Sequence, residues 1–375
     1  MRAGSCRCKM WVAWVALLHA AWASAACDRR PAVLGITFRP QSPSLIDVVL
    51  QDVGRWPTGV PATIRGPSSP LGTFSEREVD GAAQLVALPG VVAVVGHQDS
   101  RNTLLAAPLY DEAGIPLVVP NSTSRAIGAA SPWVFPVAPN DSQEGAFIAA
   151  FATRVLHGRV IALLYDNDEY GRGLRDGIRP ALAAAGAELA AEAPIGSVCE
   201  AGGGSDATVL LITSRRPPPD VLVLAARQVD VACIVRQARQ RIPTLRFITG
   251  DAVEINAGQL AAMGPAADST YFVAFWYDGL TDERSVAFAI AFRRVMDATP
   301  TPAEAMQYDA LMLLMTAVRD VGADRKAIQT YLSQLGHSRP AYEGVTGPIS
   351  FGAGRRRPLY MLRVRGGATA PVPIP

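Results

Sequence analysis

Short polar side chains follow several predicted strands, at the points where those strands end. They are Asp99 and Ser100 after 91–96, Asn121, Ser122 and Thr123 after 116–119, Tyr170 after 160–165, and Asp251 after 246–249. Hydroxyl side chains together with the N–H groups at a helix start can hold a small anion such as a carboxylate. A carboxylate such as Asp251 can hold an ammonium group across a cleft. Taken alone, each Ser, Thr or Asp here is also typical of an ordinary helix cap.

The sequence contains no recognisable catalytic or metal-binding motif. Three histidines follow the first 26 residues, and His97, His157 and His337 lie far apart without Cys or carboxylate neighbours at metal-site spacing. The sequence has neither a Gly-Lys-Ser/Thr phosphate loop nor a Gly-x-Ser-x-Gly nucleophile turn. Missing motifs do not exclude an enzyme, but nothing in the sequence argues for one, and we expect no enzyme activity, no cofactor and no metal.

Short apolar runs alternate with longer amphipathic ones from residue 31 onward. The predicted strands are 32–38, 91–96, 116–119, 160–165, 221–225, 246–249 and 270–274. Many of them are continuous apolar stretches, which is typical of strands covered on both faces. Helical patterns lie between the strands, and this alternation predicts parallel α/β sheets joined by right-handed crossovers.

The number of strand–helix units, about ten, is too large for one small sheet, so we expect two doubly wound parallel-sheet lobes. Breaks in the pattern near 138–141, 275–278 and 339–347 predict three crossings between the lobes. The predicted division is an N-terminal lobe of 28–140 plus 275–341 and a C-terminal lobe of 141–274 plus 342–375. Ligands of open α/β sheets bind beyond the carboxyl ends of the strands, so the expected ligand site is the cleft between the lobes.

The N-terminus has the three parts of a secretory signal peptide, predicted over residues 1–26. Arg2, Arg7 and Lys9 precede a short apolar run at 10–18, and small residues end at Ala25. We therefore expect an exported, periplasmic protein. Without those three basic residues the formal charge of +2 becomes −1. A near-neutral chain lacks the basic face that nucleic-acid binding requires, so no nucleic-acid partner is expected.

Three cysteines follow the predicted signal peptide: Cys27, Cys199 and Cys233. Cys27 comes directly after small residues, so it is a candidate lipidation site that would anchor the chain. An exported protein can form disulfides, and Cys199 with Cys233 is the natural pair. The alternative is that Cys233 is a buried thiol on a helix, and the sequence does not decide between the two.

Several motifs, in this order and spacing, resemble the type I periplasmic solute-binding proteins, specifically the Leu/Ile/Val-binding-protein-like group that serves ABC importers. The resemblance covers most of the chain after the leader. The motifs are VVAVVGHQDS at 91–100, GIPLVVPNST at 114–123, NDSQEG at 140–145, DNDEYGRG at 166–173, FITGD at 247–251, YDA at 308–310 and TGPISF at 346–351.

This resemblance implies roles for the polar residues after the strands. Ser100 and Thr123, with Ser122 beside them, would hold the carboxylate of an amino acid. Tyr170 would close over the ligand from the second lobe, and Asp251 would bind its ammonium group. The family also implies hinge closure, a monomer, and ABC permease and ATPase subunits as partners.

Two departures from the family pattern fall where ligand specificity is set. Ala226 and Arg227 stand where amino-acid binders often have an aromatic residue. The first strand–helix loop is short and contains proline, and Phe38 is a candidate substitute wall. These departures weaken the transfer of a branched-chain amino acid as ligand more than the transfer of a small ligand in a cleft, but a branched-chain amino acid is still the expected ligand. An uncharged, aromatic or lipid-like solute, or a role as a ligand sensor for a regulatory partner, remain as alternatives.

Overall fold

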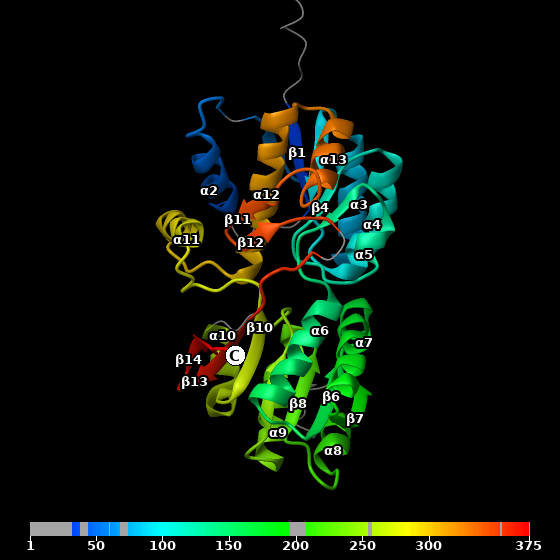
Figure 1. The fold of residues 1–375 in the computed structure, drawn as a ribbon, viewed down its shortest axis with the longest axis vertical. Helices are drawn as coiled ribbons and strands as arrows, with labels where there is room; N and C mark the ends of the chain where they lie inside the picture. Colours follow the sequence, from blue (N-terminus) through cyan, green and yellow to red (C-terminus); the bar gives the residue numbers. More distant parts are fainter. Residues whose placement is uncertain are drawn as a thin grey trace, which may run out of the picture.

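The protein is described from a computed structural model that covers residues 32–37, 44–59, 61–67, 74–195, 207–253, 257–352 and 355–374. Its elements form two lobes that lie one above the other in Figure 1. The predicted signal peptide at 1–26, the candidate lipidation site Cys27, the candidate wall Phe38 and the candidate disulfide partner Cys199 all lie outside the described residues.

Five parallel strands form the sheet of the first lobe, in the order β2-β1-β3-β4-β5. The strands are β1 (Val33–Ile36), β2 (Thr63–Arg65), β3 (Val91–Val95), β4 (Leu117–Val119) and β5 (Val134–Pro136). The helices of this lobe are α2 (Ser44–Val53), α3 (Phe74–Ala87), α4 (Ser100–Glu112), α5 (Ile127–Ala130), α11 (Glu283–Met296), α12 (Pro302–Val321) and α13 (Arg325–Gln334). A small hairpin of β11 (Tyr342–Gly344) and β12 (Gly347–Ile349) lies beside α12.

Seven strands form the second sheet, in the order β14-β13-β10-β9-β8-β6-β7. The strands are β6 (Val160–Tyr165), β7 (Glu188–Pro194), β8 (Val221–Ala225), β9 (Arg246–Thr249), β10 (Thr270–Ala274), β13 (Tyr360–Arg365) and β14 (Ala368–Pro371). The helices are α6 (Asp141–Ala150), which continues as a π-helical turn (Phe151–Val155), α7 (Glu169–Ala184), α8 (Ala207–Thr213), α9 (Gln228–Arg241), and α10 (Ala257–Met263) with a 3-10 turn (Gly264–Ala267).

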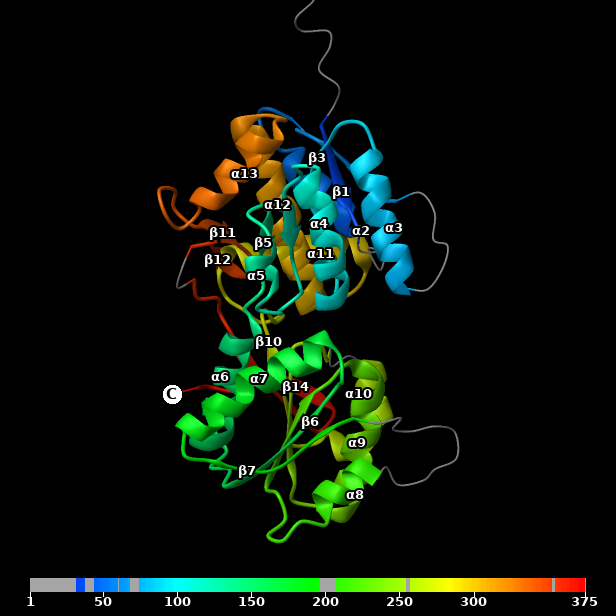
Figure 2. The same ribbon diagram turned by 90° about the vertical axis from the view of Figure 1, so that its right-hand side faces the viewer.

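The continuous apolar runs are strands with helices on both faces, as predicted. In β6, Ile161 and Leu163 belong to the core that includes α6 and α7, whereas Ala162 and Leu164 belong to the core under α8 and α9. Figure 2 shows these two helix layers on either side of the second sheet. Alternate side chains of a strand point to opposite faces, so a strand buried on both sides has no polar positions. The predicted fold class, two parallel α/β lobes, is confirmed.

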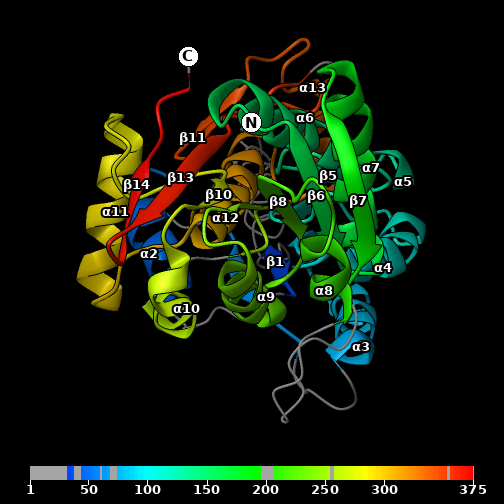
Figure 3. The same ribbon diagram turned by 90° about the horizontal axis from the view of Figure 1, so that it is seen from below.

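The antiparallel strands β13 and β14 were not predicted from the sequence. They extend the second sheet beyond β10 at its edge, which is visible from below in Figure 3. The turn between them is Gly366-Gly367, with φ of 57° and 78°. A two-residue hairpin with positive φ at both positions favours glycine, so this Gly-Gly pair was the available sequence signal.

The chain passes between the two sheets three times: after β5, after β10, and between β12 and β13. The sequence predicted the last crossing near residues 339–347, but in the structure this segment is still hydrogen-bonded to the first lobe. The carboxylate of Asp309 on α12 accepts hydrogen bonds from the backbone N–H groups of Val345 (2.8 Å) and Thr346 (2.9 Å). Residues 342–349 therefore lie with the first lobe rather than the second, and the crossing comes later.

Helices α6 and α7 approach so closely that their contact positions require glycine. A Cβ atom added to Gly177 would lie 2.2 Å from the carbonyl oxygen of Asp141, and one added to Gly145 would lie 2.4 Å from the carbonyl carbon of Gly177. Both obstacles are backbone atoms, which cannot rotate away as a side chain can. This close contact fixes the relative position of the two helices that later contribute to the candidate site.

We predict that Gly177→Ala destabilises the protein by about 1–3 kcal/mol, because overpacking against backbone forces the helices apart. Urea denaturation measures the change. Gly128→Ala on α5 is the matched control, since its Cβ would make only an ordinary 3.7 Å contact with Pro136. Equal stability of the Gly177 variant and the native protein would contradict the proposed packing constraint.

Candidate functional site

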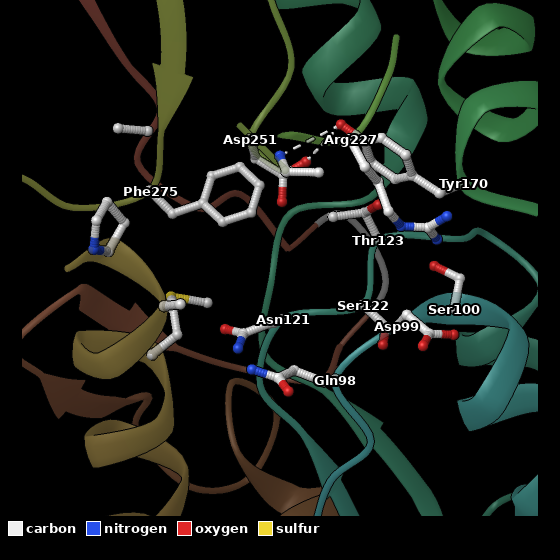
Figure 4. Close-up of a pocket in the computed structure, with 15 residues that line it drawn as sticks. Gln98, Asp99, Ser100, Asn121, Ser122, Thr123, Tyr170, Arg227, Asp251 and Phe275 are labelled. Carbon is white, nitrogen blue, oxygen red and sulfur yellow. Dashed lines mark hydrogen bonds between the residues drawn. The ribbon is translucent and has the colours of Figure 1, made fainter. Parts of the chain in front are cut away.

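A cavity of about 320 Å³ lies between the two lobes, at the carboxyl ends of their strands. Its wall is formed by Gln98, Asp99, Ser100, Asn121, Ser122, Thr123, Tyr170, Arg227, Asp251, Ala252, Ala274, Phe275, Pro302, Ala303 and Met306. Figure 4 shows the labelled members from both lobes converging on this space. The structure thus brings together the seven polar residues predicted from the ends of the strands. Their contact with a ligand stays a prediction.

Two of these seven residues form side-chain hydrogen bonds within the first lobe. The side chain of Asp99 caps α4, because it accepts hydrogen bonds from the backbone N–H of Asn102 (2.8 Å) and from its Nδ2 (2.7 Å). The Ser122 hydroxyl lies 2.9 Å from the Thr103 hydroxyl and donates to the His97 carbonyl at 3.3 Å. The helix-cap interpretation therefore holds for Asp99, and Ser122 is anchored within its own lobe.

The other first-lobe residues leave polar groups facing the cavity. Ser100, the first residue of α4, accepts a hydrogen bond from the Ser124 backbone N–H at 3.3 Å. The Nδ2 of Asn121 is buried and makes no hydrogen bond to any described residue. The Thr123 carbonyl accepts from the backbone N–H of Asp141 at 2.9 Å, which joins the first lobe to the start of α6. Hydroxyl and amide groups at a helix start suit a small carboxylate.

The second lobe presents a hydrogen-bonded chain of acidic and phenolic groups. Tyr170 Oη donates to Asp251 Oδ1 at 3.1 Å and accepts from the backbone N–H of Ala252 at 3.4 Å. The backbone N–H of Asp251 donates to Glu144 Oε1 at 2.8 Å. These bonds hold the Asp251 carboxylate at the cavity wall, as the dashed lines of Figure 4 indicate for Tyr170.

Burial raises the pKa values of the two acidic residues in this cluster, Asp251 and Glu144. Burial raises the pKa of Asp251 to about 6, although hydrogen bonds involving Glu144 and Tyr170 oppose the rise. Burial and the neighbouring charge of Asp251 raise the pKa of Glu144 well above its usual range. With a pKa of about 6, Asp251 carries a negative charge at neutral pH. A carboxylate held ionised in a buried place is a good partner for a cation.

The sequence analysis did not identify Glu144 as a site residue. It lies one turn into α6, within the NDSQEG motif, and it is fully buried. The Asn140 side chain caps this helix and forms a capping box with Gln143. That capping pattern was the available signal that a helix begins here and turns Glu144 inward.

Arg227 stands where the family's amino-acid binders often carry an aromatic residue. Its guanidinium lies over the Tyr170 ring, 5.6 Å from the ring centre, and forms an ion pair with Asp168. Its backbone N–H donates to Asp166 at 2.8 Å. The position therefore adds a paired positive charge to the polar end of the cavity instead of an aromatic wall.

The opposite end of the cavity is apolar. Phe275, at the second crossing, lines the cavity together with Pro302, Ala303 and Met306 at the start of α12. These residues were not predicted as site residues, because the prediction rested on polar side chains after strands: Phe275 follows β10 but is apolar, and the other three stand at a helix start. The cavity thus has a polar end and an apolar end, an arrangement suited to a small amphipathic solute.

Three further predictions concern groups outside the cavity. Within the described residues, no three His, Cys, Asp or Glu side chains are grouped so as to hold a metal ion. None of the described helices combines the length and apolarity needed to cross a membrane. Cys233 on α9 is disulfide-bonded. Its partner lies outside the described residues, so the pairing with Cys199 stays a prediction.

Comparison with known proteins identifies the family. The periplasmic binding protein family matches residues 75–368 of the chain. The chain belongs to this family, and to its type I, Leu/Ile/Val-binding-protein-like group. It is a family of substrate-binding proteins rather than of enzymes.

Two curated relatives support this assignment. An amino acid binding protein of Pseudomonas aeruginosa is 29% identical over 185 residues, which are 49% of this chain and 48% of that protein. A Leu/Ile/Val-binding protein homologue of Brucella abortus is 23% identical over 72% of this chain and 70% of its own length. The chain thus spans about half the length of the first of these relatives.

Solved structures show the same fold. A branched-chain amino acid transporter substrate-binding protein of Streptococcus pneumoniae, in complex with isoleucine, superimposes with a TM-score of 0.78 at 20% identity, covering 92% of this chain and 99% of that chain. A solute-binding protein of R. palustris in complex with benzoate gives 0.76 at 18% identity, covering 92% and 96%. At these identities the likeness establishes the fold and leaves the ligand to be argued from the cavity.

The buried Asp141, at the start of α6, makes protein stability depend on pH. Burial raises its pKa to about 7 from an ordinary value of 3.8, with the Thr123 hydroxyl opposing the rise. The folded protein therefore retains a proton that the unfolded chain releases between these values. The contribution of Asp141 to stability therefore falls as pH rises from about 4 to about 7, by up to about 4 kcal/mol.

We predict that Asp141→Asn is more stable than the native protein at pH 8, with an advantage that shrinks toward pH 5, because asparagine does not ionise. Chemical denaturation at both pH values measures the difference. Asp176→Asn, an exposed position on α7, is the control and should show no such pH-dependent gain. An Asp141→Asn advantage that is the same at pH 5 and pH 8 would refute the argument.

Proposed function

We propose that the protein is the extracytoplasmic solute-binding component of an ABC importer, and that it captures an aliphatic amino acid of the branched-chain type between its lobes. One observation carries the proposal: a single cavity has an ionised carboxylate, a hydroxyl-lined helix start and an apolar end. These are the three chemical parts that a zwitterion with an aliphatic side chain would need.

In this proposal each end of the ligand has its own partner. The ammonium group lies against Asp251, which Tyr170 holds in place. The ligand carboxylate lies against the hydroxyls of Ser100 and Thr123 in the opposite lobe. The cavity volume of about 320 Å³ lies at the small end of the range for ligand pockets, which suits an amino acid better than a lipid.

The ligand would bind by closure of the two lobes. Ser124 in the first lobe donates a hydrogen bond of 2.9 Å to Glu169 in the second, so the lobes already touch beside the cavity. A ligand that contacts Asp251 in one lobe and Ser100 in the other favours the closed arrangement, because only closure permits both contacts. The closed form would then present its ligand to permease and ATPase partners, as the family implies. The family's periplasmic setting supports the same location for this chain.

A second candidate ligand is an aromatic acid. The guanidinium of Arg227 reaches the cavity wall, and a structural neighbour from R. palustris is in complex with benzoate. Such a ligand has no ammonium group, so its affinity would depend on Arg227 and not on Asp251.

We predict that Asp251→Asn weakens binding of leucine, isoleucine or valine by more than about 100-fold, because an ammonium group would lose its buried counter-charge. Isothermal titration of the purified protein measures the affinity. Asp176→Asn removes the same charge at an exposed site and should bind as the native protein does. Unchanged affinity in the Asp251 variant, or binding of benzoate in preference to these amino acids, would favour the second candidate.

We also predict that amino-acid affinity falls by about tenfold between pH 7 and pH 5. Asp251 has a pKa of about 6, so it becomes protonated over this interval and loses its attraction for the ammonium group. Neither the ammonium nor the carboxylate of the ligand titrates there. Titrations at both pH values test this, with Asp251→Asn expected to give a flat profile. A native protein whose affinity is also flat would argue against Asp251 as the ammonium partner.

A further inference from the structure

A second cavity, of about 340 Å³, lies beside the first and third crossings between the lobes. It is bounded by α5 and the end of β5, by α13, and by the chain entering the third crossing. Its wall consists of Ser124, Arg125, Gly128, Ser131, Pro132, Val134, Phe135, Pro136, Asn140, Gln329, Ser333, Phe351 and Arg355. No residue of the main ligand cavity is among them.

The charged residues in this wall are both arginines, Arg125 and Arg355, and no lining residue is acidic. Neither arginine forms an ion pair with any described residue, whereas Arg227 at the main cavity is paired with Asp168. Arg125 lies close enough to the buried Asp141 to lower its pKa but does not bridge to it.

The backbone fixes Arg355 in the cavity. Its Nη1 donates to the carbonyl of Pro136 at the end of β5, and its own carbonyl accepts from Gln143 Nε2 at 2.6 Å. A guanidinium has five N–H donors, so most of its donor capacity lies outside this single bond. Burial lowers the pKa of Arg355, and a neighbouring Arg357 adds positive charge. An anion stabilises a half-buried guanidinium most strongly where no carboxylate is already paired with it.

The serine hydroxyls of the wall are already engaged as donors. Ser124 donates to Glu169, Ser131 to Asp111, and Ser333 to the Thr330 carbonyl. The cationic N–H groups of Arg125 and Arg355 are therefore the main donors left for a ligand. Planar guanidinium groups match the oxygens of phosphate, sulfate and carboxylate groups in paired hydrogen bonds.

We propose that this second cavity binds a small free oxyanion, of the phosphate, sulfate or short dicarboxylate class, between Arg355 and Arg125. The site is separate from the main ligand cavity. It lies beside the first and third of the three crossings that connect the lobes. It does not depend on the identity of the transported solute.

Isothermal titration of the full chain with inorganic phosphate, against chloride at matched ionic strength, tests this proposal in the absence of any amino acid. We expect saturable binding of about one phosphate per chain. Arg355→Gln should weaken it by about tenfold or more, because a charge-assisted hydrogen bond is lost. Arg356→Gln is the matched control: Arg356 is the exposed next residue and does not line the cavity. Its phosphate binding should equal that of the native protein.

If the Arg355 variant does not fold, Arg125→Gln provides a second test. Arg125 is exposed, so its replacement should leave the fold intact. Phosphate binding should still weaken several-fold. Parallel titrations with sulfate and succinate define the anion class. Absence of saturable binding for all three anions would overturn the proposal. So would equal weakening by Arg356→Gln, or loss of phosphate binding in Arg227→Gln with retention in Arg355→Gln, which would place the anion in the main cavity.

Discussion

The rest of the site is arranged around one constraint: an ionised carboxylate, Asp251, is held half-buried between the two lobes. Tyr170 donates a hydrogen bond to this carboxylate, whereas burial and the charge of Asp251 raise the pKa of the neighbouring Glu144 well above its usual range. Two carboxylates this close repel each other when both are ionised, which contributes to the raised pKa of Glu144. The arrangement therefore places the negative charge of Asp251 at the cavity wall, where a ligand cation can offset it.

The packing of α6 against α7 is what allows that arrangement. Glu144 comes from α6 and Tyr170 from α7, so their meeting at Asp251 requires the two helices to approach at Gly145 and Gly177. Helix α6 also begins at the first crossing, and its Gln143 is bonded to the chain of the third crossing. The crossing segments, the acidic cluster and the second cavity are thus connected through one short helix. A change in that helix would affect all three.

The sequence predicted the features that depend on local patterns. Continuous apolar runs such as 160–165 identified strands buried on both faces, and polar residues after them, such as Ser100 and Asp251, were brought to one cavity. Features that depend on distant contacts could not be predicted in this way. The third crossing is displaced because Asp309 on α12 binds the backbone of Val345, and such a pairing has no signature in either segment alone. Phe275 and Met306 form the apolar end only because a crossing and a helix start meet in space.

The charge balance of the main cavity favours a zwitterion over a simple anion. Two carboxylates line it, at Asp99 and Asp251, and the one lining cation, Arg227, is already paired with Asp168. Capping by Asp99 also occupies a backbone N–H of α4 that an incoming anion would otherwise use. A ligand bearing only a carboxylate would have to enter against this negative charge. It would also leave Asp251 without a positive counter-charge. A ligand with an added ammonium group would neutralise Asp251 and gain an attraction that is strong in a low-dielectric site. The replacement of an aromatic wall by Arg227 therefore alters the shape of the polar end without reversing its preference for a cation.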